Sequence, residues 1–249
     1  MLADRFHVMP LRDAVTAICE GRRLPDHAAA ITFDDGYLNN LETAAPILRK
    51  HGMTATFFLT TGFIDGTHAP WWYRLRSVIR DPVRIGGLES ELKNLPATER
   101  ERRVAVLTPD GTSPFAMMNW DQVKSLTGMG FDIGAHTVSH PSLGVEPDAA
   151  VEEEIGGSLR RIAGMTGTTP VVFAYPYGRD VDISDGAVRC LRERGCIGAV
   201  TTNHGMNRAG DDVYRLRRFN VTGRHSAGAL EAMVSGLGCA CHSRGGLPG

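Results

Sequence analysis

Two adjacent carboxylates, Asp34 and Asp35, follow an apolar, β-rich run at residues 28–33 and precede a glycine. Neighbouring side chains on an extended chain point in different directions, so one acid can bind a cation while the other handles protons. Farther along, His136 and His140 stand four residues apart, and on a helical turn imidazoles at this spacing share one face. One aspartate and two histidines with open positions are typical of a catalytic divalent metal site and predict hydrolysis. The hypothesis assigns Asp35, His136 and His140 as metal ligands and Asp34 as the general base.

A third segment, Phe-Ala-Tyr-Pro-Tyr-Gly at residues 173–178, also follows an apolar run. Its proline and glycine restrict the backbone and leave main-chain N–H groups that could stabilise an oxyanion. Each of the three segments also has a simpler interpretation: an exposed turn or helix cap for the acids, ordinary surface or core histidines, and a plain turn. Because all three follow predicted strands, they meet at one edge of a parallel sheet, and the metal site is the better interpretation.

The apolar runs that position these residues are short and rich in β-forming residues. We predict strands at residues 28–33, 54–59, 131–135, 171–174 and 197–201. Helical patterns lie between them, at residues 41–51, 120–129, 149–164 and 184–194. Asn119 with Gln122 resembles a capping box at the start of one of these helices. Alternating strands and helices predict an α/β fold with a parallel sheet, either a closed barrel or a doubly wound sheet.

The chain has 249 residues, a length typical of one large domain, and we predict a single domain over residues 1–249. Residues 65–114 interrupt the alternation with aromatic residues and helical patterns at residues 73–79 and 96–107. They are predicted to form a helical insertion or lid over one face. Residues 239–249 are glycine-rich and are predicted to be a flexible tail.

Composition excludes several function classes. The net charge of −1 provides no general positive field for nucleic acid, so such partners are disfavoured. No apolar stretch has the length of a membrane span, and the first ten residues carry charges where a signal peptide needs an apolar run. The five cysteines are scattered and odd in number, which favours free thiols. We expect a cytoplasmic protein without an integral membrane segment, and composition does not indicate its oligomeric state.

In this order, Thr-Phe-Asp-Asp-Gly, His-Thr-x-x-His and Tyr-Pro-Tyr-Gly resemble the motifs of the polysaccharide deacetylase (NodB-homology) family of carbohydrate esterases. The resemblance covers about residues 28–221. It implies an irregular (β/α) barrel with about seven strands. It also implies removal of an N-acyl group, with N-acetyl as the expected one, from an amino sugar in a glycan or glycan precursor. The base and the three metal ligands keep the roles assigned above, and Tyr177 becomes the backbone oxyanion donor.

Two positions depart from the family pattern. Members typically carry an arginine that pairs with the base at the position of Ala174, and Arg218 is the candidate substitute, with a surface arginine as the alternative. The late Leu-x-x-His motif of the general acid has no clear match. His204 and His225 are the nearby histidines that could protonate the leaving amine, or they are ordinary loop residues. The general acid is therefore unassigned.

Substrate binding is assigned to Trp120, Pro176 and Arg218, with the aromatic residues 71–73 as further sugar-stacking candidates. Aromatic faces cover the apolar side of a pyranose, although the same residues could instead form the core of the insertion. Trp120 is preferred because it precedes His136 closely.

These observations predict an enzyme that uses one divalent metal, with zinc expected and cobalt, nickel or manganese as alternatives. Its partner is an N-acetylated sugar or glycan. Two other functions remain open. One is hydrolysis of another small amide or formyl group on a lipid-linked or natural-product sugar, and the other is a non-catalytic carbohydrate-binding barrel.

Overall fold

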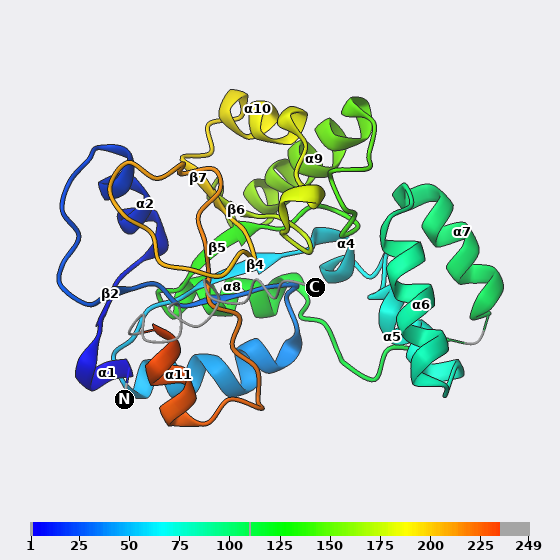
Figure 1. Ribbon diagram of the computed structural model, residues 1–249, viewed down its shortest axis with the longest axis horizontal. Coiled ribbons are helices and arrows are strands. Elements are labelled where there is room, and N and C mark those ends of the chain that lie inside the picture. Colours follow the sequence, from blue (N-terminus) through cyan, green and yellow to red (C-terminus); the bar gives the residue numbers. More distant parts are fainter. Residues whose placement is uncertain (1, 110, 235–249) are drawn as a thin grey trace, which may run out of the picture.

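Five short strands form one parallel sheet at the centre of the fold (Figure 1). The computed structural model describes residues 2–109 and 111–234. The strands are β3 (Thr32–Phe33), β4 (Thr56–Leu59), β5 (Asp132–Ala135), β6 (Val172–Ala174) and β7 (Gly198–Val200). They pair in sequence order, and every pair is parallel. A doubly wound sheet reverses its strand order, whereas unbroken order belongs to a curled barrel wall, so the barrel prediction is confirmed.

A separate two-stranded parallel sheet pairs β1 (His7–Val8) with β2 (Ala28–Ala29). The strand predicted at residues 28–33 is therefore two strands in different sheets. The prediction of one strand was wrong because the N-terminal strand β1, which it missed, pairs with the first part of this run alone. The described part of the chain holds seven strands, divided into five and two.

The main sheet is buried on both faces, as its apolar strands require. Successive side chains of β4 point to opposite faces, and Phe57 and Phe58 are both 0% exposed. Phe57 packs with the large helices that cover one face, whereas Phe58 packs against Leu11, Val15 and Ile18 of α2 (Leu11–Cys19). Apolar side chains pack against both faces of the sheet. The polar residues that could take part in catalysis therefore lie in the loops that follow the strands.

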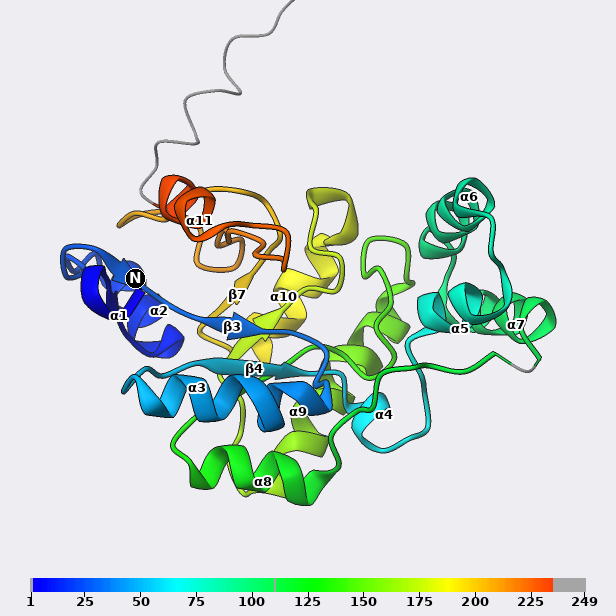
Figure 2. The same ribbon diagram turned by 90° about the horizontal axis from the view of Figure 1, so that it is seen from below.

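The large core forms under the helices that the sequence predicts. These are η1 (Asn40–Ala44) running into α3 (Ala45–Lys50), α8 (Trp120–Gly128), α9 (Asp148–Thr166) and α10 (Asp185–Glu193). Figure 2 shows α3 and α8 on one side of β4. The capping box is confirmed, since Asn119 Oδ1 accepts from the Gln122 N–H at 3.0 Å and Gln122 Oε1 accepts from the Asn119 N–H at 2.8 Å.

Three helices stand together to one side of the sheet (Figures 1 and 2). They are α5 (Trp71–Val78), α6 (Pro82–Lys93) and α7 (Ala97–Leu107), and we name them the three-helix segment. Sequence patterns predict α5 and α7 but miss α6, whose centre contains Gly86 and Gly87. The segment has its own small core, in which α5 contributes Trp71 and Leu75.

Short helices complete the described part of the chain: α1 (Leu2–Arg5), α4 (Thr61–Ile64), the 3-10 helix η2 (Asp180–Asp182) and α11 (Ala227–Val234). Cys19, Cys190 and Cys196 are free thiols. Within residues 2–109 and 111–234, no helix combines the length and apolar character needed to cross a membrane. The predicted tail at residues 239–249 lies outside the described residues.

Candidate active site

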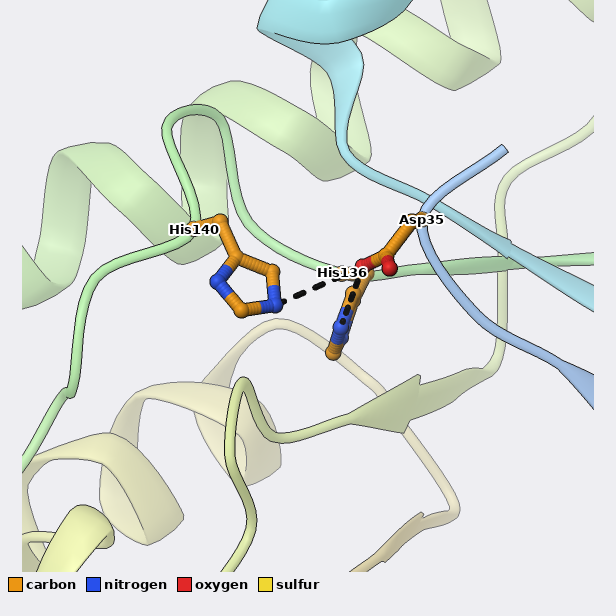
Figure 3. Close-up of side chains that lie close together, drawn as sticks. All are labelled: Asp35, His136 and His140. Atoms are coloured by element: carbon orange, nitrogen blue, oxygen red, sulfur yellow. Dashed lines mark ion pairs between the residues drawn. The ribbon is translucent and has the colours of Figure 1, made fainter. Parts of the chain in front are cut away.

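Asp35, His136 and His140 converge at the carboxyl ends of the strands (Figure 3). Asp35 is the second residue after β3, and His136 directly follows β5. Asp35 Oδ1 lies 3.4 Å from Nε2 of His136 and 3.4 Å from Nε2 of His140. The three ligand atoms lie within 4.8 Å of one another, so a single cation could contact all of them. The structure therefore brings together the three side chains that the sequence predicts as ligands.

The backbone that presents these ligands is not helical. The expected helical turn between His136 and His140 is instead a loop, with φ of 66° at Thr137 and 59° at His140. Asp35 also has a positive φ, 73°. Left-handed backbone at residues other than glycine costs on the order of 1–3 kcal/mol each and persists only where the surroundings enforce it. This loop conformation, and not a helical turn, places both imidazoles against Asp35.

The donor set fits a divalent cation. Asp35 Oδ1 is buried and has no hydrogen-bond partner within the described ranges, although it faces two imidazoles. His136 Nδ1 lies 2.6 Å from the Ala174 carbonyl oxygen and donates to it, which fixes the ring with Nε2 facing Asp35. Burial outweighs the opposing effect of the Asp35 carboxylate and, with the nearby Arg100, lowers the pKa of His140 to about 3, so this imidazole is neutral. Imidazole and carboxylate groups are common ligands of divalent transition metals.

The neighbouring carboxylates also affect the protonation of His136. Burial opposes a charge on His136, but the nearby carboxylates of Asp35 and Asp34 outweigh it and raise the pKa of His136 overall. Because a metal ligand must be deprotonated, a cation bound by these residues would compete with protons, and metal affinity is expected to weaken as the pH falls.

Asp34 lies beside the cluster in a bidentate ion pair with Arg218. Its two carboxylate oxygens accept from Nη1 and Nη2 of Arg218, each at 2.8 Å. The Nε of Arg218 donates to the Thr201 carbonyl at 2.8 Å, which fixes the guanidinium plane. Burial raises the pKa of Asp34, but Arg218 and the two histidines outweigh it and lower the pKa to about 2. Asp34 is a carboxylate at neutral pH and can accept a proton.

The third predicted segment forms a strained turn next to the histidines. Tyr177 has φ of 59°, and its ring centroid lies 4.8 Å from that of His140. Among the hydrogen bonds of the described residues, none uses the Tyr177 backbone N–H as donor. This group is free to bind an oxyanion. Pro176 is buried, does not line the cavity, and acts on the turn by accepting from the Gly178 N–H at 2.6 Å.

A cavity of about 360 Å³ opens over these groups. Its aromatic wall consists of Tyr37, Trp72, Tyr73 and Tyr177, and its polar floor of Asp34, Asp35, His136 and His140. Trp72 and Tyr73 belong to α5 and reach the site from the three-helix segment. Sequence reasoning missed Tyr37, although it stands two residues after Asp35.

Trp120, the preferred sugar-stacking residue, lies away from this cavity. It is 8% exposed, its Nε1 donates to Asp65 Oδ1 at 2.6 Å, and the Arg161 guanidinium lies over its ring at 5.4 Å. Trp120 precedes His136 closely in the sequence, but it begins α8 whereas His136 follows β5, so the two residues lie at different places in the fold. Trp120 instead anchors Asp65, at the start of the chain that leads to the three-helix segment.

The two histidine candidates for the general acid also lie outside the residues that line the cavity. His204 is exposed and contacts the Phe219 ring, with centroids 5.1 Å apart. His225 is exposed, and its Nδ1 lies 3.0 Å from the Thr222 N–H. Apart from the two predicted ligands, the cavity contains no histidine within the described ranges.

The family model for polysaccharide deacetylase matches residues 21–196 of this chain, which is more than half of its length. The chain therefore belongs to the polysaccharide deacetylase family. It is 20% identical over 232 residues to YxkH of Bacillus subtilis (strain 168), a protein named for the same family. The match covers 93% of this chain and 65% of YxkH, so the chain spans less than two thirds of that relative.

Solved structures share the fold. The deacetylase PplD of Streptococcus pyogenes, determined in complex with acetate, is similar with a TM-score of 0.69 and 18% identity, over 94% of this chain and 82% of PplD. IcaB of Ammonifex degensii is similar with a TM-score of 0.64 and 20% identity, over 92% and 82% of the two chains. A de-N-acetylase of Aggregatibacter actinomycetemcomitans has a TM-score of 0.65 and 17% identity, over 93% and 85%.

Proposed function

We propose that this chain hydrolyses an N-acyl group, with acetyl as the expected one, from an amino sugar in a glycan or glycan precursor, and that the reaction depends on a divalent metal. One observation carries the proposal: the buried, unpartnered Oδ1 of Asp35 faces two imidazole Nε2 atoms at 3.4 Å, beside an ionised Asp34 and an open cavity. Membership of the polysaccharide deacetylase family supports the same reaction.

Asp35, His136 and His140 would hold the cation. When bound, it supplies Lewis acidity, polarising an acyl carbonyl and lowering the pKa of water. We expect zinc, while the same donors accept cobalt, nickel or manganese according to availability.

The chain's own groups handle the protons and the developing charge. Asp34 takes a proton from the attacking water as the oxygen bonds to the acyl carbon, and the free Tyr177 N–H donates to the resulting oxyanion. The C–N bond then breaks and the amine leaves with a proton. Asp34, protonated in the first step, supplies it, because a carboxyl with a pKa of about 2 is a strong acid toward an amine. The proposal therefore needs neither His204 nor His225, which do not line the cavity.

We expect the cavity to hold a sugar unit. Its volume of about 360 Å³ lies within the range of small-molecule sites, and its walls are aromatic above a polar floor. Aromatic faces bind the apolar side of a pyranose while the floor meets the acylamino group.

The function is tested by release of acetate from a panel of N-acetylated monosaccharides, oligosaccharides and nucleotide- or lipid-linked sugars. Chelated protein is assayed before and after each divalent metal is restored. Acetate release that returns with metal supports the proposal and names the substrate class. Formate release in its place would indicate the formyl alternative, and glycan binding without turnover would indicate a carbohydrate-binding barrel.

Arg218→Met is expected to move the acid limb of kcat/KM to higher pH. Arg218 holds the pKa of Asp34 low, so its loss lets burial raise that pKa, and Asp34 becomes protonated and inactive at pH values where the native base is ionised. The measurement is a pH–rate profile of metal-loaded protein. Arg217→Met, at an exposed neighbouring position, is the matched control, and an acid limb identical in all three proteins would remove this role for Arg218.

Tyr73→Ala is expected to raise KM about 3- to 10-fold with little change in kcat, since aromatic contacts contribute ~0.5–1.5 kcal/mol beyond the area they bury. Tyr73 lines the cavity but is not among the rings that contact His140. Tyr73→Phe keeps the ring and is expected to retain most of the affinity. Equal KM values for all three proteins would show that the sugar does not contact this wall.

A further inference from the structure

Arg100, on α7, is a fully buried charge beside the ligand loop at residues 137–140. Its side chain is 0% exposed, a rare environment for arginine unless its donors are paired. Its Nη2 donates to the Ser139 carbonyl at 3.1 Å and its Nη1 to the His140 carbonyl at 3.3 Å. The nearest carboxylate in an ion pair with it is Glu101, at 3.5 Å. The guanidinium therefore contacts the main chain of the ligand loop directly.

A carboxylate accepts hydrogen bonds from backbone N–H groups of the same loop. On α9, Glu154 Oε2 accepts from the N–H groups of Val138 at 2.8 Å and Ser139 at 2.9 Å. Its other oxygen, Oε1, accepts from Ser139 Oγ at 2.6 Å. Two N–H groups of the loop, those of Val138 and Ser139, thus face an anion, while its last two carbonyls face a cation. Each charge matches the end of the peptide dipoles that it contacts.

His140 has more need of such support than His136. The ring of His136 is fixed by the hydrogen bond from Nδ1 to the Ala174 carbonyl. The Nδ1 of His140 is buried without a hydrogen-bond partner among residues 2–109 and 111–234. Its ring position therefore follows from packing against Trp72 and Tyr177, at 4.9 and 4.8 Å between centroids, and from its own left-handed backbone, which Arg100 contacts.

The three-helix segment meets the catalytic loops at two further points. Trp71 Nε1 donates to Tyr177 Oη at 3.0 Å. Lys93 on α6 forms an ion pair of 2.8 Å with Asp182, whose side chain is 1% exposed. Each of the three helices therefore contacts a segment that follows a strand of the main sheet, and among these contacts only those of Arg100 reach the backbone of a predicted ligand.

We propose that Arg100 is a positioning residue for His140, so that the metal affinity of the site depends on the three-helix segment. The inference rests on the proposed function, because His140 is assigned as a metal ligand there. Without the guanidinium, the loop can relax from its left-handed conformation, and Nε2 of His140 moves out of register with Asp35 and His136.

The test is titration of metal-free protein with Co²⁺, followed by its visible absorption, which reports ligand geometry as well as affinity. Arg100→Met is expected to raise the Kd for Co²⁺ about 10- to 100-fold, the usual effect of losing a group that supports a ligand, and to alter the absorption bands. Arg100→Lys keeps the positive charge but lacks the planar guanidinium. Its Kd for Co²⁺ is expected to lie between those of the wild type and Arg100→Met. Arg103→Met is the matched control on the same helix, since Arg103 is 41% exposed and pairs with Glu91 and Glu99.

The thermal midpoint of each metal-free variant separates positioning from loss of fold. A Kd for Arg100→Met within twofold of the wild type would overturn the inference while leaving the proposed function intact. If Arg100→Met does not fold, a Kd for Arg100→Lys within twofold of the wild type would overturn the inference instead. Absence of Co²⁺ and Zn²⁺ binding by the wild type would overturn the proposed function and this inference with it.

Discussion

Asp34→Asn is expected to lower kcat about 10²- to 10⁴-fold, the range that positioned acid–base groups contribute, while the Kd for Zn²⁺ or Co²⁺ changes little. Asparagine keeps the shape of the side chain but cannot accept a proton from water or return it to the amine. The measurement is acetate release under saturating substrate and metal, together with a metal titration.

The pair with Arg218 requires a control for this variant. An asparagine side chain would accept one hydrogen bond from the guanidinium where the Asp34 carboxylate accepts two. The thermal midpoint is therefore compared with that of wild type, and Asp26→Asn serves as the matched exposed control. A kcat for Asp34→Asn within tenfold of the wild type, in folded and metal-loaded protein, would exclude Asp34 as the base. It would also exclude the return of the proton from this carboxyl.

His136→Ala is expected to raise the Kd for Zn²⁺ more than ~100-fold and to reduce turnover to background, because loss of a ligand exceeds the ~10- to 100-fold cost of losing a group that only supports one. Metal content after dialysis and acetate release are measured on the same samples. His51→Ala, at an exposed histidine that directly follows α3, is expected to match the wild type in both metal content and acetate release.

The opposite result would be informative as well. Turnover by His136→Ala that equals the wild type after exhaustive chelation would show that hydrolysis does not need this cluster. Retained metal with lost turnover would instead place the cation elsewhere and leave His136 a role in binding the substrate.

The arginine that pairs with Asp34 comes from a different segment in this chain than in the family pattern. The sequence has alanine at position 174, at the end of β6, where the family pattern has arginine. Arg218 reaches Asp34 from a segment that runs beside the neighbouring strand, since Leu216 bridges Val200 of β7 in parallel. Adjacent parallel strands end at the same edge, so a long side chain from either can reach the same carboxylate.

The sequence alone determined the alternation of strands and helices and the edge at which the polar segments lie. Apolar runs of four to six residues are strong local signals, and parallel strands carry their carboxyl ends to one edge whatever the loops do. For this reason the convergence of Asp35, His136 and His140 could be predicted without coordinates. The capping box before Trp120 is equally local, because its two partners are three residues apart.

Only the tertiary structure decided which distant side chains complete the site. Contacts between segments far apart in the chain determine the loop conformation at Thr137 and His140 and the partner of Asp34. They also determine that Trp72 and Tyr73, and not Trp120, line the cavity. Arg100 stands one helical turn before the buried Val104, but arginine is almost never fully buried, so its sequence position did not single it out. Burial and hydrogen bonding are properties of the packed molecule, and no local pattern encodes which of several similar residues will face the core.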